Sequence, residues 1–187
     1  MLPLPIEIVG SPFALRHLQP TRDIAMVLYD VFVNDANDMR FWLRGEKIKS
    51  VDVVLKGLER AYKCNNMYMY YIMVKNKIVG EIGFASIDQE NESACIDYWL
   101  FPEVRGQRLI DRFLPRIEEL AFNMLKLKQV VLGIDVDNMA SRKIAERNGY
   151  TLNGISKSGK MWVDGSLHGE CEYVKKKTEW LKEKRNA

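Results

Sequence analysis

The sequence predicts an α+β domain built on a mixed, mostly antiparallel sheet of about seven strands flanked by about four helices. Two amphipathic helical segments come first, a run of strand-like segments starts near Met67, and a strand–helix–strand unit follows. The length of 187 residues and an apolar content of 47% suit a single core. We therefore expect one domain over residues 1–187, with its core at about 12–176 and a basic C-terminal tail at 177–187.

The first third of the chain predicts a short strand and two capped helices. Residues 15–18 suit a strand, and Thr21 and Ser50 are each placed to cap a helix. Apolar side chains recur at helical spacing after both caps: Ile24, Val27, Leu28, Val31 and Phe32, then Val51, Val54, Leu55, Leu58 and Tyr62. The polar loop between the two helices carries Phe41 and Trp42.

The rest of the chain predicts an antiparallel meander and then a crossover. Aromatic and branched residues favour strands at 68–74, 78–87, 94–100, 129–136, 150–155 and 171–175. Helical periodicity predicts a helix over 109–124, in which Pro115 should cause a kink or a shifted start. A second helix over 139–148 has Asn138 as its cap and Gly149 as its stop, and Asp164-Gly165 suits a turn between the last two strands.

Composition excludes several classes of protein. The net charge of +3, from 28 basic and 25 acidic residues, gives little field for direct nucleic-acid binding. The three cysteines are far apart, which favours reduced thiols over disulfides, and no Cys-x-x-Cys pair suggests a metal. No apolar run has the length of a membrane helix, so we expect a cytoplasmic protein that uses no metal and no membrane.

The segment from Tyr98 to Ile110 turns from a strand into a helix. Backbone N–H groups at such a helix start are unsatisfied and carry partial positive charge, which suits a phosphate, and Arg105 and Arg108 would add two charges. The alternative is that Gly106 and the arginines reflect only turn geometry and solvated charge.

A second segment, Asp137-Asn138-Met139-Ala140-Ser141, follows a predicted strand and opens a helix. On its own it is compatible with a plain helix cap in which Asn138 serves the first turn. Its position at the end of a strand raises the alternative that Asn138 and Ser141 contribute to a binding site.

Together and in this order, the two segments resemble the GNAT superfamily, in particular its Rim-type branch of ribosomal-protein N-terminal acetyltransferases. The likeness covers most of the chain, and its motifs are Leu15-Arg16-His17-Leu18, Val79-Gly80-Glu81-Ile82-Gly83-Phe84, Ile96-Asp97-Tyr98-Trp99-Leu100, Asp137-Asn138-Met139-Ala140-Ser141 and Asn148-Gly149-Tyr150-Thr151-Leu152.

The resemblance implies a sheet that splays after the strand ending near Leu100, with acetyl-CoA as cosubstrate in the gap. The backbone near Leu100 and Phe101 would face the thioester, and Asn138 and Ser141 would meet the pantetheine arm. The diphosphate would rest on the turn and helix start formed by Arg105, Gly106, Gln107, Arg108, Leu109 and Ile110.

Direct attack of the amine on the thioester needs a group that takes a proton and a group that protonates the leaving thiolate. The resemblance implies Ser141 as the acid, because the tyrosine position of other GNAT enzymes is Ala145 here. Glu81 and Asp97, on neighbouring predicted strands, are the candidate bases. Two departures from the family pattern are Arg108, where a glycine is usual, and the absence of any acid in residues 156–162.

We therefore expect an N-acetyltransferase that acts on a primary amine, either a protein N-terminus or a small polyamine or drug amine. Phe41, Trp42 and Trp162 would line the acceptor groove. The alternative is a GNAT-fold module that binds CoA weakly and has a regulatory role. The sequence leaves open whether two copies of the chain pair as a homodimer.

Overall fold

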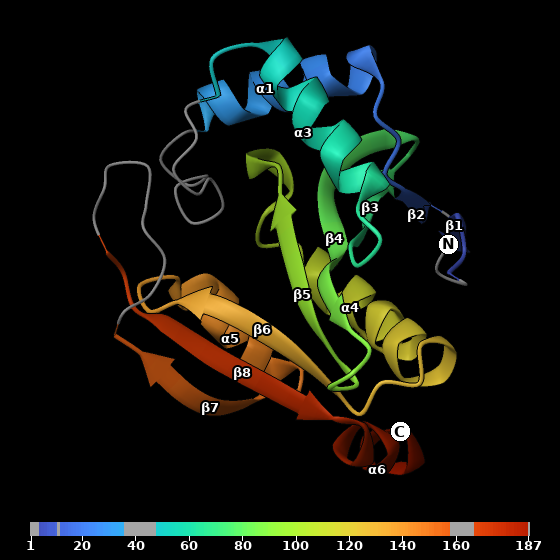
Figure 1. The fold of residues 1–187 in the computed structure, drawn as a ribbon, viewed down its shortest axis with the longest axis vertical. Helices are drawn as coiled ribbons and strands as arrows, with labels where there is room; N and C mark the ends of the chain where they lie inside the picture. Colours follow the sequence, from blue (N-terminus) through green and yellow to red (C-terminus); the bar gives the residue numbers. More distant parts are fainter. Residues whose placement is uncertain (1–3, 11, 36–47, 158–166, 187) are drawn as a thin grey trace.

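The computed structural model describes residues 4–10, 12–35, 48–157 and 167–186. Its one sheet has eight strands with helices on both faces (Figure 1). The strands are β1 Glu7–Gly10, β2 Phe13–His17, β3 Tyr68–Val74, β4 Lys77–Asp88, β5 Ser93–Leu100, β6 Gln129–Asp135, β7 Thr151–Ser156 and β8 Glu170–Lys176. The α-helices are α1 Arg22–Asn34, α3 Val51–Lys63, α4 Leu109–Glu119, α5 Met139–Arg147 and α6 Lys177–Asn186.

The strand order across the sheet is β1-β2-β3-β4-β5-β6-β8-β7. Every neighbouring pair is antiparallel except β5 and β6, which are parallel and are joined through α4. The predicted α+β class and mixed sheet are therefore confirmed, with eight strands in place of about seven. The strand that the sequence analysis missed is β1, which pairs with β2 at the sheet edge.

Two of the helices, α1 and α3, cover one face of the sheet. The predicted caps are present: Thr21 Oγ1 accepts from the Ile24 N–H at 3.3 Å, and Ser50 Oγ accepts from the Val53 N–H at 3.4 Å. The buried faces are narrower than predicted, because the side chains of Val27 and Tyr62 are exposed. The residues that α1 and α3 bury are Ala25, Leu28, Phe32, Val54 and Leu58.

Two apolar clusters lie on opposite faces of the sheet. The larger one joins α4 to the strands, and the smaller one joins α1 and α3 to them. Alternation along β5 divides its side chains between the two: Ile96 belongs to the larger cluster and Trp99 to the smaller one. A catalytic group on β5 thus faces one side or the other according to its position in the strand.

Ordered structure extends beyond the predicted core at both ends of the chain. The strand β1 precedes residue 12, and α6 lies within the expected basic tail. Trp180 of α6 is only 5% exposed and its ring lies 5.3 Å from that of Phe122. Pro115 lies inside α4, which begins at Leu109 as predicted and passes into a π-helical turn over Leu120–Met124. Within the described part of the chain, no helix is both long and apolar enough to cross a membrane.

Candidate active site

A gap opens in the sheet where β5 and β6 separate. The two strands pair only at their starts, Ser93 to Cys95 with Gln129 to Val131, and they diverge after that point (Figure 1). The ends of the strands lead into the starts of α4 and α5. The sequence thus places two helix N-termini around one gap.

The backbone N–H of Leu100 points into this gap. The Phe101 N–H donates to the Val79 carbonyl at 2.8 Å, across β4. In an antiparallel pair, neighbouring residues alternate between bonding to the partner strand and pointing away from it. Leu100 is paired with Gly80 in the non-bonded position, so its N–H lies on the edge of β5 that faces β6.

Phe101 is turned away from the gap. Its N–H is occupied by Val79, and its buried ring stacks on Trp99 with 5.4 Å between the ring centres. The N–H groups of Leu100 and Phe101 therefore lie on opposite edges of β5, and the cofactor role of both residues stays a prediction. The reason is the alternation along an extended strand, which sends adjacent N–H groups to opposite sides.

The turn into α4 leaves its first amides open. Gly106 has φ +75°, and Arg108, the N-cap residue, has φ +55° and ψ +30°, both in the left-handed region. None of the described side chains caps α4, whereas Thr21, Ser50 and Asn138 cap α1, α3 and α5. The amides at the start of α4 are therefore suited to an anion.

Arg108 stands where the family pattern usually has a glycine, and its backbone conformation shows what this replacement costs. Its backbone has the left-handed conformation that glycine reaches at little cost, so the arginine is strained by about 1 kcal/mol. Its side chain and that of Gln107 are exposed, and Gln107 Nε2 donates to the Glu103 carbonyl at 3.2 Å. Leu109 and Ile110 bury their side chains in the core.

The guanidinium of Arg105 does not serve the turn as predicted. Its Nε and Nη2 donate to the Leu100 carbonyl at 3.0 and 2.9 Å, and the same group pairs with Asp35 at the end of α1. The Arg105 N–H donates to Pro102. The side chain therefore fixes the end of β5 against α1 through charge-assisted hydrogen bonds to the Leu100 carbonyl and the Asp35 carboxylate.

Across the gap, α5 presents Asn138 and Ser141. The Asn138 Oδ1 accepts from the Ser141 N–H at 3.1 Å, so the capping interpretation is confirmed and only the amide NH2 of Asn138 is left for a ligand. The Tyr98 hydroxyl lies 3.5 Å from the Ser141 carbonyl. Tyr98 thus links β5 to α5, and burial raises its pKa, which keeps its proton in place.

Tyr98 is a site residue that the sequence analysis missed. Its position in the sequence could have indicated this. Side chains alternate between the two faces of a strand, so Tyr98 faces the α5 side when Asp97 and Trp99 face the other side. Ala145, farther along α5, is buried and offers no hydroxyl. Here a tyrosine of β5 lies beside the start of α5.

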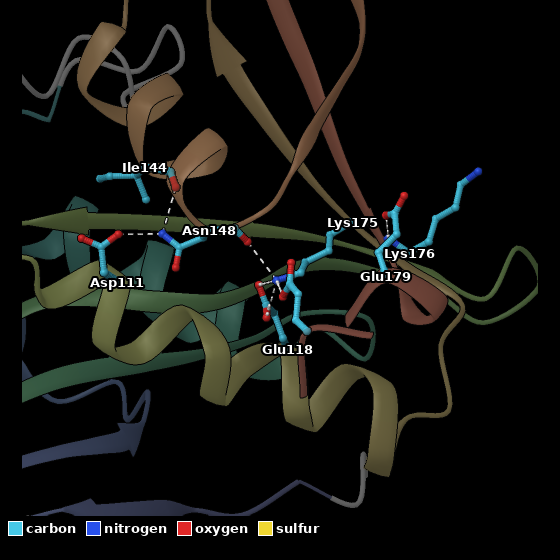
Figure 2. Close-up of polar contacts among 8 residues, drawn as sticks. Asp111, Glu118, Ile144, Asn148, Lys175, Lys176 and Glu179 are labelled. Carbon is cyan, nitrogen blue, oxygen red and sulfur yellow. Dashed lines mark hydrogen bonds and ion pairs between the residues drawn. The ribbon is translucent and has the colours of Figure 1, made fainter. Parts of the chain in front are cut away.

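Asp111 ties the start of α4 to the end of α5. Arg147 Nη2 donates to its carboxylate at 2.7 Å. Asn148 Nδ2 donates to the same carboxylate at 2.6 Å and also to the Ile144 carbonyl (Figure 2). Burial alone would raise the pKa of Asp111, but the bonds from Arg147 and Asn148 leave it lowered. The negative charge in the first turn of α4 is thus balanced and does not oppose an anion there.

Below this tie lies a buried ion pair. Lys175 Nζ donates to Glu118 at 3.2 Å, to Glu183 at 2.6 Å and to the Asn148 carbonyl at 2.8 Å (Figure 2). Lys175 and Glu118 are 3% and 1% exposed. The group joins α4, the end of α5, β8 and α6. It therefore fixes the position of α4 relative to the end of α5.

Glu81 and Asp97 both line a cavity of about 290 Å³ on the opposite face, between the sheet and the helices α1 and α3. Glu81 is 3% exposed, and the Trp99 Nε1 donates to its carboxylate at 3.0 Å. Burial raises the pKa of Glu81 to about 7, although the bond from Trp99 opposes the rise. Glu81 is therefore a carboxylate that exchanges a proton near neutral pH.

Asp97 lies where the cavity meets the gap. It follows Cys95, the last residue of β5 that pairs with β6, and it is half-buried. Its partner in β4 is Gly83, where a Cβ would collide with the Tyr68 carbonyl oxygen of β3, so the position suits glycine alone. The structure thus brings both predicted carboxylates to one cavity, with Asp97 on the strand that borders the gap.

Some predicted residues lie outside the described part of the chain, namely Phe41, Trp42, Trp162 and the turn at Asp164-Gly165. Among the described residues, Asp135, Asp137 and His168 bring three ligand atoms within 4.8 Å of one another. The His168 Nδ1 lies 3.4 Å from Asp137 and 3.7 Å from Asp135. The absence of a metal stays a prediction.

Comparison with known proteins agrees with this geometry. YdaF of Bacillus subtilis, named "Putative ribosomal N-acetyltransferase", is 28% identical over 181 residues, 94% of this chain and 97% of YdaF. The ribosomal-protein-serine acetyltransferase of Escherichia coli is 31% identical over 96 residues, 51% of this chain and 54% of that protein. The solved structure of the ribosomal L7/L12 α-N-protein acetyltransferase RimL with coenzyme A has a TM-score of 0.81 at 23% identity, covering 90% and 96% of the two chains.

The family model described as the acetyltransferase (GNAT) domain matches residues 13–151, from β2 to the start of β7. This range includes the gap, the open start of α4 and both carboxylates of the cavity. The chain belongs to the GNAT family of N-acetyltransferases.

Proposed function

We propose that this acetyl-CoA-dependent N-acetyltransferase modifies the α-amine of a protein N-terminus. The observation that carries acetyl transfer at this gap is the Leu100 N–H, which points into the gap between the open start of α4 and the half-buried Ser141 of α5. Such a donor stabilises the negative charge that develops on a thioester oxygen during attack by an amine.

Acetyl-CoA would bind along this gap. The amides from Gly106 to Ile110 would hold the diphosphate, with the exposed guanidinium of Arg108 as a further donor. The amide NH2 of Asn138 would donate to the pantetheine arm. Charge balance at Asp111 supports this arrangement, since the only carboxylate in the first turn of α4 is already paired.

In the transfer step, the amine nitrogen would form a bond to the acetyl carbon and the carbon–sulfur bond would break. The amine loses a proton, and the thiolate gains one. We assign Ser141 as the donor to sulfur, with Tyr98 as the neighbouring hydroxyl that orders the start of α5.

Glu81 is the better candidate for the base. Its pKa of about 7 lies near that of an N-terminal amine, which favours proton transfer at neutral pH. Asp97, on the strand that borders the gap, would attract the ammonium form of the acceptor and lead it toward Glu81. The two carboxylates would then have distinct roles, one in binding and one in proton transfer.

The choice of a protein N-terminus rests on the names of the relatives, since both curated relatives are named as acetyltransferases of ribosomes or ribosomal proteins. The test is to mix the purified protein with acetyl-CoA and a panel of peptides, polyamines and drug amines and to follow thiol release. Acetylation of peptide α-amines supports the proposal. Turnover of polyamines alone would support a small-molecule enzyme, and a CoA thermal shift without any turnover would support a regulatory module.

A further inference from the structure

The cavity beside Glu81 has an apolar wall. Of its described lining residues, Glu81, Asp97 and Arg60 are charged, and most of the others are aliphatic, aromatic or methionine. The two carboxylates lie at the sheet, whereas apolar side chains of α1 and α3 such as Leu28, Phe32, Val54 and Leu58 form the opposite side. The cavity is therefore polar at one end and apolar at the other.

Gly57 lines the apolar end of the cavity. It lies in the middle of α3, where glycine is less favourable than every residue except proline. Its backbone does not need glycine, because its φ is not in the left-handed region, and a Cβ placed on it would have no atom within 4 Å. What the missing side chain provides is room, since Gly57 lines the cavity.

We infer that this cavity holds an apolar group attached to the acceptor amine, and that Gly57 determines how large that group can be. The inference rests on the proposed function, because it assigns the cavity to the acceptor. The amine would lie at the Glu81 and Asp97 end, and an apolar first side chain of a peptide would extend between α1 and α3 past Gly57.

The number of positive charges distinguishes this kind of acceptor from a polyamine. Each further ammonium group of a polyamine would need a carboxylate or water in place of the aliphatic wall. An acceptor with one amine and one apolar group matches both ends of the cavity.

The first experiment uses size series of acceptors with acetyl-CoA: linear alkylamines of increasing length, and short peptides that differ only in a first residue of Gly, Ala, Leu or Phe. We expect kcat/KM to rise about fourfold per added methylene until the cavity is full. Leu and Phe peptides should exceed the Gly peptide by at least tenfold. A flat series, or a preference for spermidine over every apolar amine, would overturn the inference and leave acetyl transfer intact.

The second experiment fills the cavity with Gly57→Leu. We expect at least a tenfold loss of kcat/KM for Leu and Phe peptides and little change for the Gly peptide. The matched control is Gly154→Leu, at an exposed position of β7 where a Cβ also meets no atom within 4 Å. Equal loss for every peptide, or the same loss in Gly154→Leu, would contradict the role of Gly57.

Binding of hexylamine, measured by calorimetry, keeps the inference testable even if no amine is acetylated. We expect hexylamine to bind the wild-type protein and to bind Gly57→Leu at least tenfold more weakly. Failure of acetylation with this pattern of binding would remove the proposed function and retain the cavity's ligand class. Absence of hexylamine binding would remove the inference itself.

Discussion

The indole Nε1 of Trp99 donates a 3.0 Å hydrogen bond to the carboxylate of Glu81, which is 3% exposed. The bond crosses from β5 to β4 on the side of the sheet that lines the cavity. One hydrogen bond does not compensate for burial, so the pKa of Glu81 stays raised to about 7. The raised pKa makes the stability of the protein depend on pH, and the base role that we propose for Glu81 extends this dependence to activity.

For activity, we expect kcat/KM to rise with pH through about 7, as Glu81 loses its proton and becomes a base. Glu81→Gln should lower kcat at least a hundredfold and remove this rise. Asp97→Asn should mainly raise KM for the amine and keep the rise. The measurement is a rate profile from pH 5.5 to 9, and an unchanged profile in Glu81→Gln would exclude Glu81 as the base.

The raised pKa makes stability depend on pH in the opposite direction from a salt-bridged acid, whose pKa is lowered. Between the unfolded value of 4.5 and about 7, the folded protein binds more protons than the unfolded chain, so stability falls as pH rises. Glu81→Gln removes this penalty and should gain on the order of 2–3 kcal/mol at pH 8 and almost nothing at pH 4.5. Denaturant unfolding at both pH values measures the difference, which should not appear in Glu90→Gln at an exposed position just after β4.

Arg108→Gly tests the strained turn. Glycine adopts a φ of +55° freely, so the free energy of unfolding should rise by about 1 kcal/mol. The loss of the guanidinium should at the same time raise the KM for acetyl-CoA about three- to tenfold. Lys126→Gly is the matched control, because Lys126 also has a positive φ of +60° and follows the helical segment at its other end. It should gain similar stability with no change in KM.

The positions that the sequence predicted well are those decided by neighbours in the chain. The caps Thr21, Ser50 and Asn138 form bonds to residues three positions away, so their pattern is visible locally. Aromatic and branched residues likewise predicted the central strands and placed Glu81 and Asp97 on neighbouring ones.

The positions that it missed depend on distant partners. Arg105 leaves the turn because Asp35, 70 residues earlier, lies beside it. The C-terminal tail forms the helix α6, in which Trp180 is buried against Phe122. This contact is with a distant residue, so no local sequence pattern predicts it. Tyr98 faces Ser141, 43 residues away, only because the two strands separate.

Ser141→Ala and Tyr98→Phe separate the two hydroxyl groups near the gap. If Ser141 protonates the leaving thiolate, its loss should lower kcat ten- to a hundredfold with little change in the affinity for acetyl-CoA. Tyr98→Phe removes only the 3.5 Å contact to the Ser141 carbonyl and should lower kcat less than fivefold. Single-turnover rates with a good peptide acceptor provide the comparison, and the reverse order would assign the acid to Tyr98.

Lys175→Met tests the buried ion pair beneath the gap. Removal of the ammonium leaves Glu118, which is 1% exposed, without its cation, and this should cost about 3–5 kcal/mol. Burial already raises the pKa of Glu118 although Lys175 opposes the rise, so without Lys175 it should rise further. Because a protonated Glu118 carries no charge, the loss of stability should be smaller at pH 5 than at pH 8.

The neighbouring Lys176 supplies the control for this substitution. Its side chain is exposed and points away from Glu118 and Lys175 (Figure 2), and only its backbone N–H bonds to Glu179. Lys176→Met should therefore change the free energy of unfolding by less than about 0.5 kcal/mol at either pH. Similar losses in both variants would mean that Lys175 acts through general surface charge. A loss confined to Lys175→Met and reduced at pH 5 would identify the uncompensated Glu118 carboxylate as its cause.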